Sequence, residues 1–265
     1  MSVPLPETLT PSKIGKFVSC PLAFRYSYID RLPEPPSPQQ VRGTLLHRAL
    51  QLLFSDGPAS RRTRERGASA LDEAWREMEV GDDVASLELD DAARQSFLLE
   101  ARGLLDRYFT LEDPSSVRPV GLELDLRVNL DGVELRGIID RLDHLPGDDF
   151  VVVDYKTGRS PRVEQARSRL AGVQFYAFLC EQALGRRPSE VRLMYLRDQV
   201  VVVESPTDQT MRGLRQRALA VWAAIERACR TEDFRPNPSP LCKTCSFQVQ
   251  CPAFQAGVER LARAD

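Results

Sequence analysis

The chain is short of long apolar runs and of net charge. No stretch approaches the ~20 consecutive apolar residues that a membrane-spanning helix requires, and the N-terminus lacks the basic and then apolar pattern of a secretory signal. These absences exclude a membrane protein and predict a cytoplasmic location. With 36 Lys and Arg against 38 Asp and Glu, the net charge is −2. This balance excludes a protein coated in positive charge but leaves room for a local basic groove.

The sequence also lacks a Gly-x-x-x-x-Gly-Lys-Ser/Thr phosphate loop, so it carries no helicase motor of its own. Cysteine and histidine are scarce, with six and two copies. Cysteines in a cytosolic chain are more often metal ligands or core residues than disulfide partners. Cys180 and Cys229 fall within helical patterns and are expected in the core.

The most informative stretch is a strand that ends in charged residues. The β-branched run 151–153 leads directly into Asp154, which is typical of a buried strand whose end reaches the edge of a sheet. An earlier strand is expected over residues 133–145, and the Pro-Gly-Asp-Asp sequence at 146–149 favours a turn. We therefore predict an antiparallel hairpin that places Asp140 and Asp154 on adjacent strands, close enough to hold one hard cation.

Asp154 and Lys156 leave the same face of this strand, because side chains alternate along it. A lone pair of this kind is usually an ordinary ion pair at the end of a strand. Asp140 on the neighbouring strand favours a functional role instead. So does His47, which lies beside the apolar stripe of a helix expected over residues 43–54.

Apolar periodicity and turn residues predict an α/β protein with a mixed central sheet flanked by helices. Glu123 lies on an alternating strand, where it is either an acid that supports the site or an exposed residue. The proline-rich segment 33–38 is expected to be a surface linker, and a charged helical insertion is expected over residues 56–118. Further helices are predicted over residues 9–19, 170–184 and 210–230, and further strands over residues 121–128, 191–195 and 200–204.

Three ordered motifs and a cysteine pattern resemble the PD-(D/E)xK nuclease superfamily, specifically its RecB-like and Cas4-like branch. Each motif is weak alone, but the ordered set is highly specific and spans residues 12–252. The resemblance implies one restriction-endonuclease-like nuclease domain over residues 1–265. The residues that carry it are Gly43-Thr44-Leu45-Leu46-His47, Gly137-Ile138-Ile139-Asp140-Arg141-Leu142-Asp143, Asp154-Tyr155-Lys156-Thr157-Gly158, and the cysteines Cys20, Cys242, Cys245 and Cys251.

The resemblance implies metal-dependent hydrolysis of phosphodiester bonds in DNA. It implies that His47, Asp140 and Asp154 ligate Mg²⁺ or Mn²⁺, together with the backbone carbonyl of Tyr155. It also implies that Lys156 orients or deprotonates the attacking water and steadies the developing charge.

The family usually carries a glutamine and a tyrosine four residues apart on the following helix, and this chain departs from that spacing. Gln174 and Tyr176 are two residues apart, so they cannot share one helix face. We expect Gln174 to reach the site, with Tyr176, Arg159 and Arg162 as candidates for binding the substrate. The departure concerns substrate positioning and leaves the metal centre untouched.

Four thiolates, from Cys20 and the C-terminal group Cys242, Cys245 and Cys251, could bind a structural Zn²⁺ ion or a [4Fe–4S] cluster. One distant cysteine with a clustered trio resembles the iron–sulfur staple of AddB-type and Cas4-type nucleases. Structural zinc sites more often show two tight pairs. The iron–sulfur cluster is therefore the expectation, and it would join the segment 236–255 to Cys20 chiefly for stability.

The expected activity is that of an exonuclease acting on single-stranded DNA or duplex ends in recombination and repair. Any unwinding is expected from a partner in trans, either a helicase or a repair or CRISPR protein. A Cas4-like nuclease that trims DNA before spacer integration would use the same site. A non-catalytic iron–sulfur DNA-binding module is an alternative of another class, and Mg²⁺-dependent cleavage distinguishes it from the nuclease.

Overall fold

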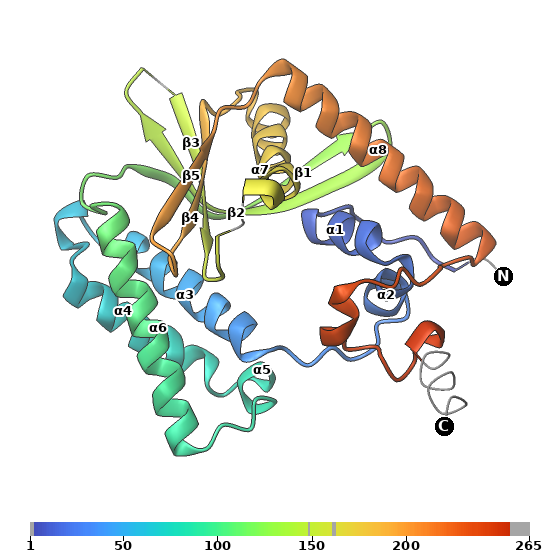
Figure 1. Ribbon diagram of the computed structural model, residues 1–265. Helices are drawn as coiled ribbons and strands as arrows, with labels where there is room; N and C mark the ends of the chain where they lie inside the picture. Colours follow the sequence, from blue (N-terminus) through green and yellow to red (C-terminus); the bar gives the residue numbers. More distant parts are fainter. Residues whose placement is uncertain (1–2, 148, 161–162, 255–265) are drawn as a thin grey trace. The chain divides into compact units, whose positions relative to one another are not determined.

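The computed structural model describes residues 3–147, 149–160 and 163–254 and divides the chain into two compact units. Unit 1 comprises Met1–Pro35, Val128–Arg136 and Arg212–Asp265, and unit 2 comprises Pro36–Arg127 and Gly137–Met211. Each unit is therefore assembled from segments that are distant in the sequence (Figure 1). The predicted catalytic residues belong to unit 2, and the four predicted cysteine ligands belong to unit 1.

A five-stranded sheet forms the centre of unit 2, and its strands follow one another in sequence order. Strand β2 pairs antiparallel with β3, β3 pairs parallel with β4, and β4 pairs antiparallel with β5. The sheet is thus mixed, and both the α/β fold and the hairpin of β2 with β3 are confirmed. The strands are β1 (Pro119–Leu130), β2 (Val133–Leu145), β3 (Asp149–Lys156), β4 (Glu190–Tyr195) and β5 (Val200–Glu204).

Helices cover both faces of this sheet (Figure 1). On one face, α3 (Pro38–Ser55), α4 (Arg64–Met78) and α6 (Asp91–Leu111) bury their apolar side chains against alternate residues of β3. On the other face lies α7 (Val163–Leu184). The helical insertion predicted over residues 56–118 contains α4 and α6, and it also includes η2 (Ala59–Arg61) and α5 (Asp82–Ala85).

Helix α3 begins five residues before the helix predicted from residue 43, so part of the expected linker is helical. The cause is a capping box. The hydroxyl of Ser37 accepts a hydrogen bond from the backbone of Gln40, and the Gln40 side chain accepts one from the backbone of Ser37. Pro38 fits the first helical position, where its missing N–H costs nothing. The proline-rich composition outweighed this signal in the sequence-based prediction.

Unit 1 contains α1 (Pro11–Ser19), α2 (Pro21–Phe24), η1 (Arg25–Ile29), most of α8 (Asp208–Thr231) and η3 (Pro240–Thr244). Helix α1 begins two residues after the start predicted at residue 9, because the Thr10 hydroxyl caps it by accepting a hydrogen bond from the backbone of Lys13 at 3.2 Å. The tip of the β1–β2 hairpin joins this unit through Leu9, which exchanges backbone hydrogen bonds with Glu134 and Arg136.

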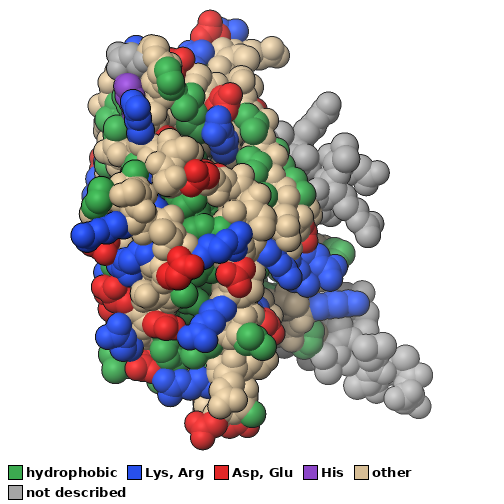
Figure 2. Space-filling view, turned by 90° about the vertical axis from the view of Figure 1, so that its left-hand side faces the viewer, with side chains coloured by type: hydrophobic (Ala, Val, Ile, Leu, Met, Phe, Trp, Pro, Cys, Tyr) green, Lys and Arg blue, Asp and Glu red, His purple; other side chains and the backbone are tan. Residues whose placement is uncertain are grey.

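The surface carries both signs of charge in close mixture. On the face shown in Figure 2, basic and acidic side chains are interspersed over the described residues, so neither sign dominates that face. Within the part of the chain that the structure describes, no helix is both long and apolar enough to cross a membrane.

Gly137 on β2 allows α7 to pack closely on the sheet. A Cβ atom at this position would lie 2.7 Å from Cδ1 of Leu179 and 3.2 Å from Cε1 of Tyr176. Leu179 is fully buried, so its side chain can make room only by displacing its neighbours in the core. Gly137→Ala should therefore lower the free energy of unfolding by about 1–3 kcal/mol in urea denaturation.

Gly103 in α6 is the matched control for this substitution, because no atom lies within 4 Å of its Cβ position. Gly103→Ala should raise the free energy of unfolding by up to about 1 kcal/mol, as expected when alanine replaces glycine in a helix with open space around the new Cβ atom. A Gly137→Ala variant as stable as the wild type would contradict the close packing of α7.

Candidate functional site

Asp140 and Asp154 lie side by side where β2 and β3 pair. Arg141 is opposite Val153 across the antiparallel strands. Asp140 precedes Arg141 on β2 and Asp154 follows Val153 on β3, so these two acids are neighbours on the same face. Both are buried, with 8% and 3% of their surface exposed. Burial is the main cause that raises the pKa of Asp154 to about 6, and the charge of Asp140 adds to it against the opposing effect of Lys156.

Lys156 lies two residues beyond Asp154 and on the same face. Its Nζ is 2.5 Å from Oδ2 of Asp154, and its side chain is 40% exposed. Burial alone would lower the pKa of Lys156, but the Asp154 carboxylate outweighs burial and the pKa is raised. Lys156 is therefore a firmly charged cation that neutralises one of the two carboxylates and still reaches solvent.

His47 comes from α3 and directs both ring nitrogens at oxygen atoms. Nδ1 lies 3.4 Å from Oδ1 of Asp140, and Nε2 lies 2.9 Å from the carbonyl oxygen of Tyr155. A carbonyl oxygen only accepts, so Nε2 is the donor. Burial would lower the pKa of His47, but the hydrogen bond and charge of Asp140 raise it to about 9. The protonated ring therefore donates to both oxygens and compensates the second carboxylate.

Glu123 on β1 adds a further acid whose role the sequence left open. Single ligand atoms of His47, Glu123 and Asp140 all lie within 4.8 Å of one another. The φ angle of Glu123 is 46°, in the left-handed region that a non-glycine residue seldom occupies. Burial, followed by the charge of Asp140, raises its pKa. Alternation of polar and apolar residues indicates a strand here, but no local pattern indicates the left-handed φ angle of Glu123.

Three of these groups, His47, Glu123 and Asp140, lie close enough together to hold a hard divalent cation. They offer two carboxylates and a ring nitrogen, and Asp154 and the carbonyl of Tyr155 are the further ligands predicted from the sequence. Ligand sets rich in oxygen suit Mg²⁺ and Mn²⁺. Asp140 is held in place from its other side, because its Oδ2 accepts a hydrogen bond from the backbone N–H of Tyr155 at 2.7 Å. The donor set is thus present before any metal binds.

The residues predicted to contact the substrate do not form one cluster among the described residues. The amide of Gln174 donates to Oε1 of Glu204 on β5 at 2.8 Å. Burial raises the pKa of Tyr176, and the charges of Asp154, Asp140 and Glu123 add to that effect. Arg159 is exposed on the loop after β3, and Arg162 lies outside the described residues.

The four predicted cysteine ligands are free thiols of intermediate exposure in unit 1. The sulfur of Cys20 accepts a hydrogen bond from the backbone of Asn237 at 3.5 Å, and the sulfur of Cys242 accepts one from Ser239 at 3.3 Å. Burial raises the pKa of Tyr26, and the nearby charges of Cys251 and Cys20 raise it further. The N-terminal and C-terminal cysteines therefore meet in one unit.

The spacing of these sulfur atoms differs from that of an assembled zinc site. Within the described residues, no three cysteine sulfurs lie within 4.8 Å of one another. A tetrahedral Zn²⁺ ion with Zn–S bonds of about 2.3 Å requires sulfur separations of about 3.8 Å. The buried cysteines Cys180 and Cys229 match the core positions expected from their helical patterns.

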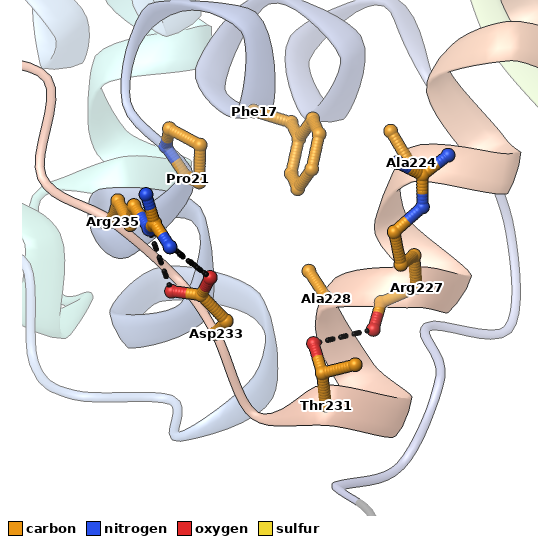
Figure 3. A pocket seen from close by; sticks show the side chains of 8 residues that line it. All are labelled: Phe17, Pro21, Ala224, Arg227, Ala228, Thr231, Asp233 and Arg235. Atoms are coloured by element: carbon orange, nitrogen blue, oxygen red, sulfur yellow. Dashed lines mark hydrogen bonds and ion pairs between the residues drawn. The ribbon is translucent and has the colours of Figure 1, made fainter.

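A separate shallow pocket of about 220 Å³ lies in unit 1 and contains none of the predicted site residues (Figure 3). The ring of Phe17 forms one wall, and an ion pair of Asp233 with Arg235 at 3.0 Å lies across from it. The pocket does not contribute to the carboxylate site. Its lining consists of Phe17, Pro21, Ala224, Arg227, Ala228, Thr231, Asp233 and Arg235.

Comparisons with known proteins show which sequences and folds the chain is similar to. The chain is 23% identical to the Gene 69 protein of Mycobacterium phage L5, over 94% of this chain and 99% of the phage protein. A solved structure described as a "Putative exonuclease", from Eubacterium rectale, is 12% identical and superposes with a TM-score of 0.56. That superposition covers 90% of this chain and 87% of the other, and it supports the shared fold.

A match to a protein family covers almost the whole sequence. The model of the PD-(D/E)XK nuclease superfamily matches residues 8–252. The matched range includes His47, Asp140, Asp154 and Lys156, which the fold brings to one end of the β2–β3 pair. The chain therefore belongs to the PD-(D/E)XK nuclease superfamily.

Proposed function

We propose that the protein is a divalent-metal-dependent deoxyribonuclease of the RecB-like and Cas4-like branch, acting as an exonuclease on single-stranded DNA or DNA ends in recombination and repair. The observation that carries the proposal is the convergence of His47, Asp140, Asp154 and Lys156 on the β2–β3 pair. Membership of a nuclease superfamily supports the chemistry. The description of the Eubacterium rectale protein supports the exonucleolytic mode.

Asp140, Asp154, His47 and the carbonyl of Tyr155 would hold Mg²⁺ or Mn²⁺, with Glu123 close enough to join them. When bound, such a cation neutralises charge on the phosphoryl oxygens and lowers the pKa of water. The protein's own contribution is to keep the acids ionised and in place. His47 and Lys156 supply the compensating charge for this.

Lys156 is the residue that we assign to the attacking water. Its raised pKa keeps the ammonium group charged, so it donates hydrogen bonds to the water or to a phosphoryl oxygen as negative charge develops there. Its pairing with Asp154 fixes its position. Gln174, Tyr176 and Arg159 remain the proposed contacts to the DNA strand, and of these Tyr176 is electrostatically coupled to the carboxylates.

The cysteines of unit 1 are proposed to hold a [4Fe–4S] cluster. Backbone N–H groups already donate to the sulfurs of Cys20 and Cys242, and such hydrogen bonds are common features of iron–sulfur sites. In a cluster each thiolate binds a different iron, so the sulfurs stand further apart than around one zinc ion. The preference for a cluster over Zn²⁺ rests on the sequence pattern of one distant cysteine with a clustered trio.

Asp154→Asn and Lys156→Ala should each lower the rate of DNA cleavage by at least about 100-fold while leaving the fold intact, because each removes a group that acts on the reacting atoms. End-labelled single-stranded DNA with Mg²⁺, Mn²⁺ or EDTA is the assay. Products that shorten from one end would establish exonucleolytic action and its polarity.

Asp72→Asn is the control for these two variants, because Asp72 pairs with Arg102 on the exposed surface of α4 and α6. It should cleave at the wild-type rate. Normal cleavage by the Asp154 or Lys156 variant would refute the assigned site. DNA binding by the wild type without cleavage under any metal would favour a non-catalytic DNA-binding module.

The affinity for Mn²⁺ should rise with pH. A ring nitrogen of His47 binds metal only after it loses its proton, and the pKa of that proton is about 9 in the metal-free protein. Protons therefore compete with the metal below pH 9, and the dissociation constant should fall by up to about tenfold per pH unit between about pH 6.5 and 9. Asp154, with a pKa of about 6, adds a second competing proton only at lower pH.

Calorimetry of Mn²⁺ binding at several pH values tests this dependence. His47→Asn should bind Mn²⁺ more weakly and without the pH slope above 6.5, because the competing proton is gone. A slope that survives in this variant would show that another group carries the proton.

Protein purified without oxygen should contain about four iron atoms and matching sulfide per chain, with a broad visible absorption band. Cys20→Ala and Cys245→Ala should each lose the band and lower the stability of unit 1, because each removes one thiolate ligand. Cys229→Ala, a buried cysteine of the same unit, should keep it. Stoichiometric zinc in place of iron would overturn the cluster, and absence of any metal would overturn both assignments.

A further inference from the structure

A buried arginine lies on the reverse side of the proposed metal site. Arg141 follows Asp140 on β2, and its side chain therefore leaves the opposite face of the sheet. It is 1% exposed, and a buried charge is strongly unfavourable unless several partners surround it. Its guanidinium donates to Glu112 through Nη1 at 2.5 Å and Nη2 at 2.9 Å, and through Nε to Asp143 at 3.1 Å. It also stacks 4.4 Å from the ring centroid of Phe54.

The same guanidinium contacts strand β3 through the side chain of Tyr155. Nη1 of Arg141 donates to the phenolic oxygen of Tyr155 at 2.6 Å. The ring of Tyr155 also packs edge-on against Tyr108, with centroids 5.9 Å apart. Tyr155 is 3% exposed. Its side chain is thus fixed at its far end as well as along its ring.

The main chain of Tyr155 touches two of the proposed metal ligands. Its N–H donates to Oδ2 of Asp140 at 2.7 Å, and its carbonyl oxygen accepts from Nε2 of His47 at 2.9 Å. That carbonyl is itself a proposed ligand. A shift of Tyr155 along or across the strand would therefore displace three ligand groups together.

Glu112 connects this arrangement to the helical insertion. It is the residue that follows α6, and Tyr108 in the last turn of α6 donates to its Oε1 at 2.6 Å. The two carboxylate oxygens of Glu112 receive the two terminal nitrogens of Arg141. A planar pair of this kind fixes direction as well as distance. The end of α6 therefore sets where the guanidinium lies.

We propose that Arg141, oriented by Glu112, is a positioning residue for the metal site, acting through Tyr155 to hold Asp140, His47 and the Tyr155 carbonyl in register for a divalent cation. The inference rests on the proposed metal-dependent function. Groups that orient metal ligands from outside the coordination sphere change metal affinity by about 10–100-fold when removed. Arg141 never touches the metal or the substrate in this arrangement.

Tyr155→Phe is the most direct test, because it deletes the one oxygen atom that Arg141 contacts on this strand. Binding of Mn²⁺ to the full chain without DNA is measured by calorimetry, and stability is measured by urea denaturation in EDTA. We expect the Mn²⁺ dissociation constant to rise about tenfold or more. The Mn²⁺ concentration that gives half-maximal cleavage should rise by the same factor, and KM for DNA at saturating Mn²⁺ should stay unchanged.

Glu112→Gln tests the orienting pair and has a matched control. Asp72 pairs with Arg102 at 2.8 Å on the exposed surface of α4 and α6. Glu112→Gln should weaken Mn²⁺ binding in the way that Tyr155→Phe does. Asp72→Asn should leave the dissociation constant at its wild-type value.

The outcomes separate this inference from the proposed function. If Tyr155→Phe and Glu112→Gln lower stability but bind Mn²⁺ like the wild type, the network is structural and the positioning role is overturned. If the wild type binds Mn²⁺ but does not cleave DNA, the proposed nuclease fails while the weakened binding of the variants still supports positioning. Failure of the wild type to bind Mn²⁺ overturns both.

Discussion

Two carboxylates buried on adjacent strands repel each other, and the rest of the site depends on compensating that repulsion. Asp140 and Asp154 meet where β2 pairs with β3, in surroundings too dry to screen their charges. Lys156 offsets one charge from the same strand, and a protonated His47 offsets the other from α3. Glu123 leaves an excess of negative charge nearby. In the proposed metal-dependent enzyme, that excess would attract a divalent cation, and the bound cation would then displace the proton from His47.

Strand β3 has one apolar face and one charged face. Val151, Val153 and Tyr155 pack into the core with α3, α4 and α6, while Asp154 and Lys156 carry charge on the opposite face. Tyr155 contacts both the core and the site, because its ring lies in the core and its peptide groups form hydrogen bonds with Asp140 and His47. The packing of the Tyr155 ring in the core therefore also fixes the position of the peptide groups that bind Asp140 and His47.

Short-range signals in the sequence predict the fold and the pairing of the two aspartates. The turn at 146–149 sets the β2–β3 hairpin, and alternation places Asp154 and Lys156 on one face. The sequence leaves the role of Glu123 open, because no local pattern indicates the left-handed φ angle that its backbone adopts. The link from Glu112 to Arg141 is not predicted either, since it joins residues that only the packed tertiary structure brings together. Contacts of this kind have no local pattern.

The segmented make-up of unit 1 has a consequence for how the chain folds during synthesis. A ribosome releases the chain from its N-terminus, and domains usually fold as units once their residues have emerged. The last segment of unit 2 ends at Met211, whereas unit 1 still needs the segment that starts at Arg212 and carries Cys242, Cys245 and Cys251. Unit 2 can therefore fold before Met1–Pro35 meets the rest of unit 1, and Cys20 stays without Cys242, Cys245 and Cys251 until that later segment has emerged. Insertion of the proposed cluster would then have to follow the emergence of that segment.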